Sequence, residues 1–296
     1  MHHFLLTIDV EDWFQVENLR PWFPLEKWSE QELRIERNTQ SILEMLGSRT
    51  DHLGNPVQAT FFVLGWIARE MPWLVREISA AGHEVASHGD NHLLCADQTQ
   101  DELRRDLDES KKRLEDIIGS RVHGYRAPSF SISPRILGVI REAGYSYDAS
   151  YNSFALNSRY GKLNTAGCSK KGIALEMDPG FYELPLSNLR IWGRCFPCSG
   201  GGFFRLIPGR VFRKAVQKVL KTQEAYHFYM HPWEVDPGQP RQTQISTLSR
   251  FRHYVNLHKT LPKLQALMDA FAHCRFSTCR DYLLYVTDDQ VLAGSI

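Results

Sequence analysis

The first 150 residues alternate between short apolar segments and amphipathic segments of helical length, and this alternation restricts the fold more than any other feature. Predicted buried strands lie at residues 4–8, 57–64, 84–86, 122–125 and 145–148. Predicted helices lie between them, at residues 33–46, 72–81, 101–118 and 134–143. This order predicts an α/β fold with a parallel sheet, either doubly wound or closed into a barrel.

Beyond residue 150 the alternation is interrupted. Residues 152–207 are rich in glycine, serine, asparagine and proline, and only residues 181–186 are typical of a strand, so we expect a long irregular insertion. Further predicted elements are helices over 211–220, 247–258, 262–272 and 280–286 and strands over 225–230 and 275–277. No linker or repeat divides the chain. We therefore expect a single domain over residues 1–296, with a C-terminal helical part over residues 241–296.

Composition excludes several function classes. The formal net charge of +1 gives no electrostatic case for nucleic acid or for an anionic membrane surface. No apolar stretch approaches the roughly 20 residues of a membrane-spanning helix. The first residues lack the basic start and long apolar run of a secretory leader. We expect a cytoplasmic protein without an integral membrane segment.

Cysteines and glycines offer two weaker signals. Cys195 and Cys198 have the spacing of a redox or zinc pair, but no second pair exists and the surrounding segment is rich in glycine and proline. We expect the six scattered cysteines to be reduced and this pair to be incidental. The three glycines at 200–202 are not followed by the Lys-Ser or Lys-Thr of a phosphate loop, so a bend or a close backbone approach is favoured.

Polar residues follow most of the predicted strands. Asp9, Glu11 and Asp12 follow the first, and His88 and His92 follow the third. Two histidines four residues apart point the same way on a helical turn and can share a metal. Two imidazoles and one carboxylate form a hydrolytic zinc arrangement. The same ligands suit non-haem iron, but those oxygenases are usually all-β proteins, which the alternation of strands and helices argues against.

Six ordered motifs carry a family resemblance. The motifs lie at residues 7–14, 59–65, 82–88, 124–131, 200–205 and 228–234. They resemble the polysaccharide deacetylases that share the nodulation-type deacetylase domain (carbohydrate esterase family 4), and in particular the branch found in exosortase-associated exopolysaccharide gene clusters. The resemblance implies a distorted (β/α)7-type barrel with a divalent metal, zinc being favoured, at the C-terminal ends of the strands.

The resemblance also implies catalytic roles. Asp9 corresponds to the general base, and Arg126 to an arginine that orients the base and keeps it ionised. His231 corresponds to the catalytic histidine, and Asp148 to an acid that tunes this histidine. The implied activity is hydrolysis of the N-acetyl groups of sugars in an exopolysaccharide or its precursor, with release of acetate.

The implied metal ligands are His88, His92 and a carboxylate that follows the base. Most family members have adjacent acids there, whereas a valine intervenes here, so the third ligand is Glu11 or Asp12. Strand alternation favours Glu11, which faces the same side as the base, but a turn beginning at residue 11 would favour Asp12. A second departure is Gly89, where many members carry serine or threonine; it removes a supporting hydroxyl and leaves the ligands intact.

Aromatic residues beside these positions could stack on sugar rings or belong to the core. They are Trp13, Phe14, Phe130, Phe203 and Trp233, of which Trp13, Phe130 and Trp233 are the predicted substrate contacts.

Two other functions remain open: an amide hydrolase acting on a small molecule, and a catalytically silent carbohydrate-binding protein. The complete set of base, ligands and acid argues against the silent protein.

Overall fold

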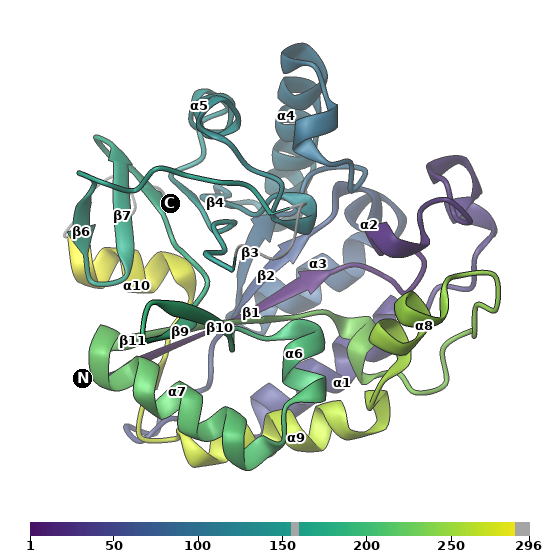
Figure 1. Cartoon of the computed structure of the whole chain (residues 1–296). Coiled ribbons are helices and arrows are strands. Elements are labelled where there is room, and N and C mark those ends of the chain that lie inside the picture. Colours follow the sequence, from purple (N-terminus) through teal and green to yellow (C-terminus); the bar gives the residue numbers. More distant parts are fainter. Residues whose placement is uncertain (155–159, 288–296) are drawn as a thin grey trace.

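A computed structural model describes residues 1–154 and 160–287 of the chain. Seven parallel strands form a curved sheet in the order β11-β1-β2-β3-β4-β5-β8 (Figure 1). They are β11 (Ala225–Met230), β1 (His3–Val10), β2 (Thr60–Val63), β3 (Glu84–Ser87), β4 (Gly124–Tyr125), β5 (Tyr147–Asp148) and β8 (Phe181–Glu183). The architecture is the predicted α/β fold of the distorted (β/α)7-barrel type, with all seven carboxyl ends at one edge.

Irregular chain segments fill the space between the two outer parallel strands, β8 and β11. The backbone N–H of Ser187 donates to the carbonyl of His227 at 3.2 Å, and the N–H of His227 donates to Ser187 Oγ at 2.9 Å. Farther along β11, the N–H of Tyr229 donates to the carbonyl of Ser199 at 2.8 Å. These bonds satisfy the outer side of β11 without a regular strand.

Helices cover the outside of the sheet (Figure 1). They are α1 (Ile35–Gly47), α2 (Gly65–Glu70), α3 (Pro72–Ala80), α4 (Gln100–Ile118), α5 (Pro134–Glu142), α7 (Gly209–Gln223), α9 (Leu257–Ala270) and α10 (Cys279–Thr287). Local sequence explains several boundaries. Thr99 and Glu102 form a capping box before α4, Gly119 ends that helix in the left-handed conformation, and Ser133 caps α5.

The predicted elements of the first 150 residues are confirmed. The structure adds the short helix α2 and four short 3-10 helices, at Glu17–Leu19, Leu25–Glu30, Cys95–Asp97 and Pro128–Phe130. The insertion over residues 152–207 is less irregular than expected. It contains β6 (Ser169–Lys171), β7 (Ala174–Asp178), β8, the hairpin of β9 (Asn188–Ile191) and β10 (Arg194–Pro197), and α6 (Gly201–Leu206). Short strands rich in polar residues gave no apolar periodicity for the prediction to use. Residues 155–159 of the expected insertion lie outside the described residues.

The C-terminal part is helical as predicted, although the boundaries differ. α8 (Thr247–Tyr254) is shorter than expected, and α9 begins at Leu257 after Asn256, whose φ is +54°. The last short strand is β12 (Arg275–Phe276), which pairs with β1. Residues 288–296 of the expected helical part lie outside the described residues.

All six cysteines are described, and none forms a disulfide. No helix in the described ranges is long and apolar enough to cross a bilayer.

Candidate active site

The strand order brings the polar groups of distant motifs to one edge of the sheet. Asp9 lies at the end of β1 and Glu11 just beyond it, while His88 follows β3. Arg126 follows β4 and His231 follows β11. Because these strands are parallel, their carboxyl ends meet at the same edge, which is where α/β folds of this kind place their chemistry.

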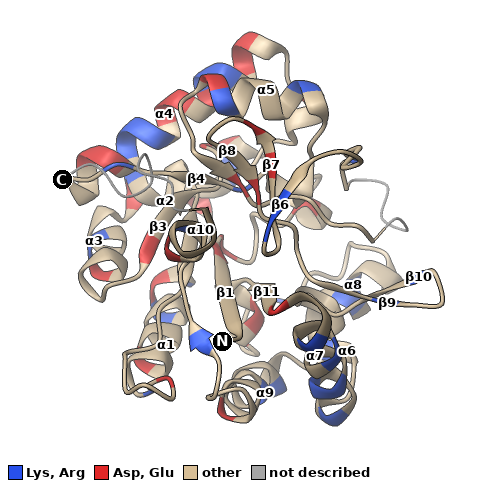
Figure 2. Cartoon of the chain, turned by 90° about the vertical axis from the view of Figure 1, so that its left-hand side faces the viewer, with Lys and Arg blue, Asp and Glu red and all other residues tan. Residues whose placement is uncertain are grey.

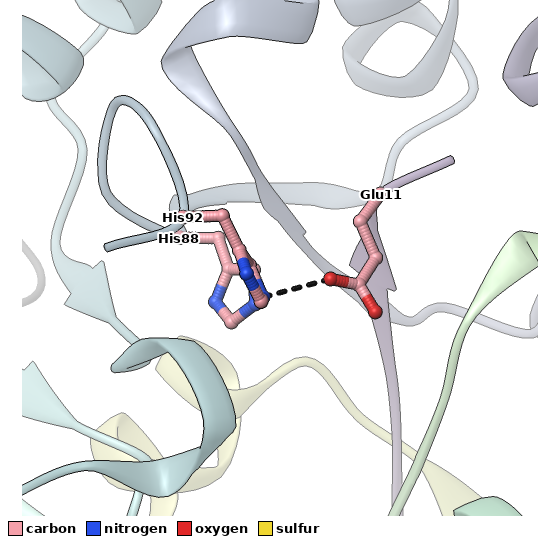
Figure 3. A group of neighbouring side chains, drawn as sticks. All are labelled: Glu11, His88 and His92. Atoms are coloured by element: carbon pink, nitrogen blue, oxygen red, sulfur yellow. Dashed lines mark ion pairs between the residues drawn. The ribbon is translucent and has the colours of Figure 1, made fainter. Parts of the chain in front are cut away.

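Glu11, His88 and His92 form a buried cluster (Figure 3). One ligand atom from each lies within 4.8 Å of the others, and Nε2 of His92 is 2.8 Å from Glu11 Oε2. Nδ1 of His88 is hydrogen-bonded to the carbonyl of Arg126 at 2.8 Å, which leaves Nε2 of that ring free. Burial lowers the pKa of His88 to about 4, so the ring is neutral at pH 7. Two imidazoles and a carboxylate fit a divalent cation such as zinc.

The two histidines do not lie on a helical turn. Residues 88–92 form a loop in which Gly89 has φ +77° and His92 has φ +51°. A Cβ at position 89 would approach Asp106 Oδ2 to 2.8 Å, which accounts for glycine where the family resemblance leads one to expect a hydroxyl side chain. The two rings converge as predicted, but the conformation of this loop brings them together, and helical periodicity does not.

Neighbouring helices fix this loop through contacts that sequence reasoning missed. The first N–H groups of α2, at Gly65 and Trp66, donate to the carbonyls of Gly89 and Asp90 at 2.8 and 2.9 Å. Asp106 of α4 accepts from the N–H of Asp90 at 3.0 Å. A helix N-terminus and a buried carboxylate thus hold the loop that carries both histidines.

Of the two carboxylates left open by the sequence, Glu11 lies in the cluster and Asp12 does not. Asp12 Oδ2 accepts from the backbone N–H groups of Arg34 and Ile35 at 2.7 and 2.9 Å, and Oδ1 accepts from the N–H of Trp13 at 2.8 Å. Asp12 therefore satisfies free N–H groups at the start of α1. Burial raises the pKa of Asp12 to about 6 even with these bonds.

Asp9 forms a fully buried ion pair with Arg126. Arg126 Nη1 lies 2.6 Å from Asp9 Oδ1 and also donates to Thr7 Oγ1 at 2.7 Å. The guanidinium is held further by the carbonyl of Ala149 at 2.9 Å and by Nε2 of His227 at 2.9 Å. Because the arginine is fixed on all sides, it fixes the direction in which the other Asp9 oxygen points.

His231 faces Asp9 and Glu11. Its Nε2 is 3.9 Å from Asp9 Oδ2 and 3.4 Å from Glu11 Oε1. Its Nδ1 lies 2.8 Å from Glu234 Oε1, and the other oxygen of Glu234 accepts from Arg205 Nε at 2.6 Å. Burial alone would lower the pKa of His231, but Glu11, Glu234 and Asp9 together raise it to about 9. His231 can therefore carry a proton at neutral pH.

The expected pairing of Asp148 with His231 is wrong. Asp148 ends β5 and accepts from the N–H of Ser150 at 3.1 Å and from Ser150 Oγ at 2.8 Å, and it also interacts with Glu183 of β8. The carboxylate beside His231 is Glu234, three residues later in the same motif. Strand β8 pairs with β5 so that Asp148 lies opposite Glu183, and the partner of Asp148 is therefore Glu183 and not the end of β11.

The predicted aromatic contacts divide into different environments. Trp13 packs edge-on against Phe23 and is buried in the core, so its expected role in substrate stacking is not supported. Trp233 is also buried but belongs to the site, because its indole stacks on His231 with a centroid separation of 5.3 Å. Phe130 packs against Tyr229, whose ring meets the edge of His231.

The two other aromatic candidates pack against aromatic side chains. Phe14 is fully buried among tryptophans, and Phe203 is half-buried against Phe154.

A cavity of about 290 Å³ lies beside the cluster of Glu11, His88 and His92. Its lining residues include His92, Asn91, Gln15, Phe23 and Leu25.

The fold and the cluster together define an α/β-barrel protein with a candidate metal centre at the carboxyl ends of its strands. Residues 54–147 match the sequence profile of the family described as polysaccharide deacetylase, and residues 149–283 match a domain of unknown function, DUF3473. Residues 54–147 are therefore similar to the polysaccharide deacetylase family. This match contains His88, His92 and Arg126, whereas Asp9 and Glu11 precede it.

Two curated relatives illustrate the match. A peptidoglycan-N-acetylglucosamine deacetylase from Bacillus cereus is 31% identical over 88 residues, which are 30% of this chain and 41% of that protein. A chitooligosaccharide deacetylase from Azorhizobium caulinodans is 33% identical over 87 residues, which are 29% of this chain and 41% of that protein. The match thus spans about two fifths of the length of these relatives.

One solved structure resembles nearly the whole chain. It is a candidate polysaccharide deacetylase from Mycobacterium smegmatis, with a TM-score of 0.64, 18% identity, and coverage of 97% of this chain and 91% of that protein. At this identity the likeness concerns the fold alone.

The two matching profiles meet between β5 and the later strands, and one sheet combines strands from both regions, so a single domain stays our prediction.

Proposed function

We propose that the protein is a metal-dependent N-deacetylase that hydrolyses the N-acetyl groups of sugars in an exopolysaccharide or its precursor. The observation that carries this proposal is the placement of Asp9 and His231 together at the edge of the Glu11–His88–His92 cluster. A carboxylate and an imidazole within reach of one acetamide are the base and the acid that amide hydrolysis needs.

Glu11, His88 and His92 would hold the divalent metal, and zinc suits this ligand set best. When bound, such an ion polarises a carbonyl oxygen and lowers the pKa of water at the site. His88 is prepared for this role because its Nδ1 is hydrogen-bonded to the carbonyl of Arg126, which fixes the ring and its tautomer.

The chain's own residues divide the proton transfers. Asp9, oriented by Arg126, accepts a proton from the water that adds to the acetyl carbon. His231, oriented by Glu234, donates a proton to the sugar nitrogen as the C–N bond breaks. The products are acetate and a free amino sugar. Asp9 and His231 have separate charged partners, Arg126 and Glu234, so the candidate base and the candidate acid are oriented independently.

The cavity beside His92 supports a sugar substrate. Its lining combines the apolar side chains of Phe23 and Leu25 with the amides of Gln15 and Asn91. The Nε2 of Gln15 is buried and has no hydrogen-bond partner within the described part of the chain. A sugar ring, with an apolar face and hydroxyl groups at its rim, matches this combination.

Acetate release tests the proposal. We expect purified protein loaded with zinc to release acetate from N-acetylglucosamine oligomers faster than from small linear or cyclic amides. The reverse preference would indicate a small-molecule amide hydrolase. Glycan binding without acetate release at any metal loading would indicate a carbohydrate-binding protein.

Metal content tests the site separately. We expect His88→Ala to lose both metal and activity, whereas His83→Ala, which removes a buried histidine outside the cluster, keeps the metal. Full metal content in the His88 variant would rule out this site.

A cytoplasmic location is part of the proposal, and cell fractionation tests it.

A further inference from the structure

Basic residues are concentrated in two segments of the chain. Of its 35 lysines and arginines, 13 lie in residues 184–223 and 237–268, and none of its 34 aspartates and glutamates does. The net charge of +1 therefore combines a strongly basic part with an acidic remainder. A charge averaged over the whole chain does not describe the field at one face.

The two segments pack against each other in the folded protein. Arg205 of α6 donates to the carbonyl of His253 in α8 at 2.7 Å, and Lys263 of α9 donates to the carbonyls of Phe204 and Ile207. Helix α7 contacts both β9 and α9. Figure 2 shows blue segments of α7 and α8 on the same side of the molecule as the β9–β10 hairpin. We call these two segments, residues 184–223 and 237–268, the basic face; they contain β9, β10, α6, α7, α8 and most of α9.

Most of the charges on the basic face are exposed and unpaired. Ten are exposed: Arg190, Arg194, Arg210, Lys214, Lys218, Lys221, Arg241, Arg250, Arg252 and Lys259. None of these ten forms an ion pair with another described residue. Their field is therefore available to a partner outside the chain.

Large apolar side chains are exposed among these charges. Trp192, at the tip of the β9–β10 hairpin, is 98% exposed, and Phe251 of α8 is 54% exposed. The others on the basic face are Phe196, Leu206, Val211 and Leu248. Of the 11 large hydrophobic side chains exposed in the described chain, these six lie on the basic face. Apolar groups gathered on one face indicate an interaction surface.

We propose that the basic face docks the protein on an anionic phospholipid bilayer. Lysine and arginine are attracted to the negative surface of such a membrane, and tryptophan, phenylalanine and leucine enter the boundary between head groups and acyl chains. A nucleic acid or an anionic glycan would satisfy the charges, but it would leave Leu206, Val211 and Leu248 in water. The proposal does not depend on the deacetylase activity.

Vesicle sedimentation with the full chain tests the proposal. We expect binding to vesicles of phosphatidylcholine mixed with phosphatidylglycerol, decreasing with added salt, and much weaker binding to phosphatidylcholine alone. The double variant Lys214→Glu/Lys218→Glu should reduce the partition coefficient at least about tenfold. The matched control, Arg105→Glu/Lys112→Glu, makes the same charge change on exposed residues of α4 and should bind anionic vesicles more than the α7 variant does.

A second variant tests the apolar contribution. Trp192→Ser removes a side chain that is almost fully exposed, so the fold should be unaffected. It should weaken binding to anionic vesicles while leaving the salt dependence in place. The proposal is overturned if the protein binds both vesicle types equally, if the α4 control loses as much binding as the α7 variant, or if the protein is retained by an anionic polysaccharide and not by vesicles.

Discussion

The indole N–H of Trp233 donates a hydrogen bond to Glu11 Oε1 at 3.2 Å. The same indole stacks on His231 and, at a centroid separation of 4.4 Å, on His253 of α8. One side chain after β11 therefore orients both the candidate carboxylate ligand and the candidate acid. Side chains that orient metal ligands tune metal affinity although they do not touch the metal.

Replacing Trp233 with phenylalanine should separate these contacts. The variant can keep ring stacking on His231, but it loses the hydrogen bond to Glu11. We expect zinc affinity to fall about tenfold, measured by competition with a chelating dye. Trp28→Phe is the matched control, because it also loses one buried indole hydrogen bond, to the carbonyl of Phe23. Equal zinc affinities in the two variants would contradict the role of Trp233.

Asp9→Asn should abolish turnover while the metal remains bound. The asparagine oxygen can still accept from Arg126, but the amide cannot accept the proton of the water. We expect the acetate-release rate to fall by at least about 100-fold, with metal content unchanged. Asp51→Asn, which alters a buried carboxylate at a loop outside the site, should retain the rate. A near-normal rate in the Asp9 variant would remove that residue from the role of base.

The two adjacent acids should respond differently to substitution. Glu11→Gln should lower metal affinity because it removes the charged ligand of the cluster. Asp12→Ala should keep the metal but lower the free energy of unfolding by about 2 kcal/mol, because buried N–H groups at the start of α1 lose their acceptor. Metal titration measures the metal affinity of both variants, and urea unfolding measures their free energy of unfolding. Metal loss in the Asp12 variant, with metal retained in the Glu11 variant, would reverse the assignment.

His253 should make the protein sensitive to mild acid. Burial, followed by the charge of Arg205, lowers the pKa of His253 from 6.5 to about 3. The unfolded chain therefore binds a proton below pH 6.5 that the folded protein does not, and acidification favours unfolding. From pH 7 to pH 5 this residue should remove about 2 kcal/mol from the free energy of unfolding.

His253→Phe tests this contribution. The phenyl ring can keep the stacking on Trp233, whereas it loses the hydrogen bond to Gln239 and cannot titrate. Urea unfolding at both pH values should show a smaller loss of stability for the variant, by about 2 kcal/mol. The same loss in both proteins would show that His253 does not couple folding to pH in this range.

Local sequence was sufficient to predict most helices and strands in the first half of the chain. Apolar strands, amphipathic helices and the caps at Thr99 and Ser133 depend on neighbours within a few residues, so their pattern is visible in the sequence. The strands β6, β7, β9 and β10 were missed because they carry few apolar residues and pair as antiparallel hairpins. Only the pairing partner makes such segments strands.

The sequence by itself determined which chemical groups are available: a carboxylate after β1, two histidines after β3, an arginine after β4 and a histidine after β11. The tertiary structure decided which of them meet. It turned Asp12 toward the start of α1, left Glu11 beside His92, and gave His231 the partner Glu234 in place of Asp148. It also brought the two basic segments together on one side of the molecule. The physical reason is that side-chain direction and long-range proximity depend on the packing of strands and helices, which no local pattern encodes.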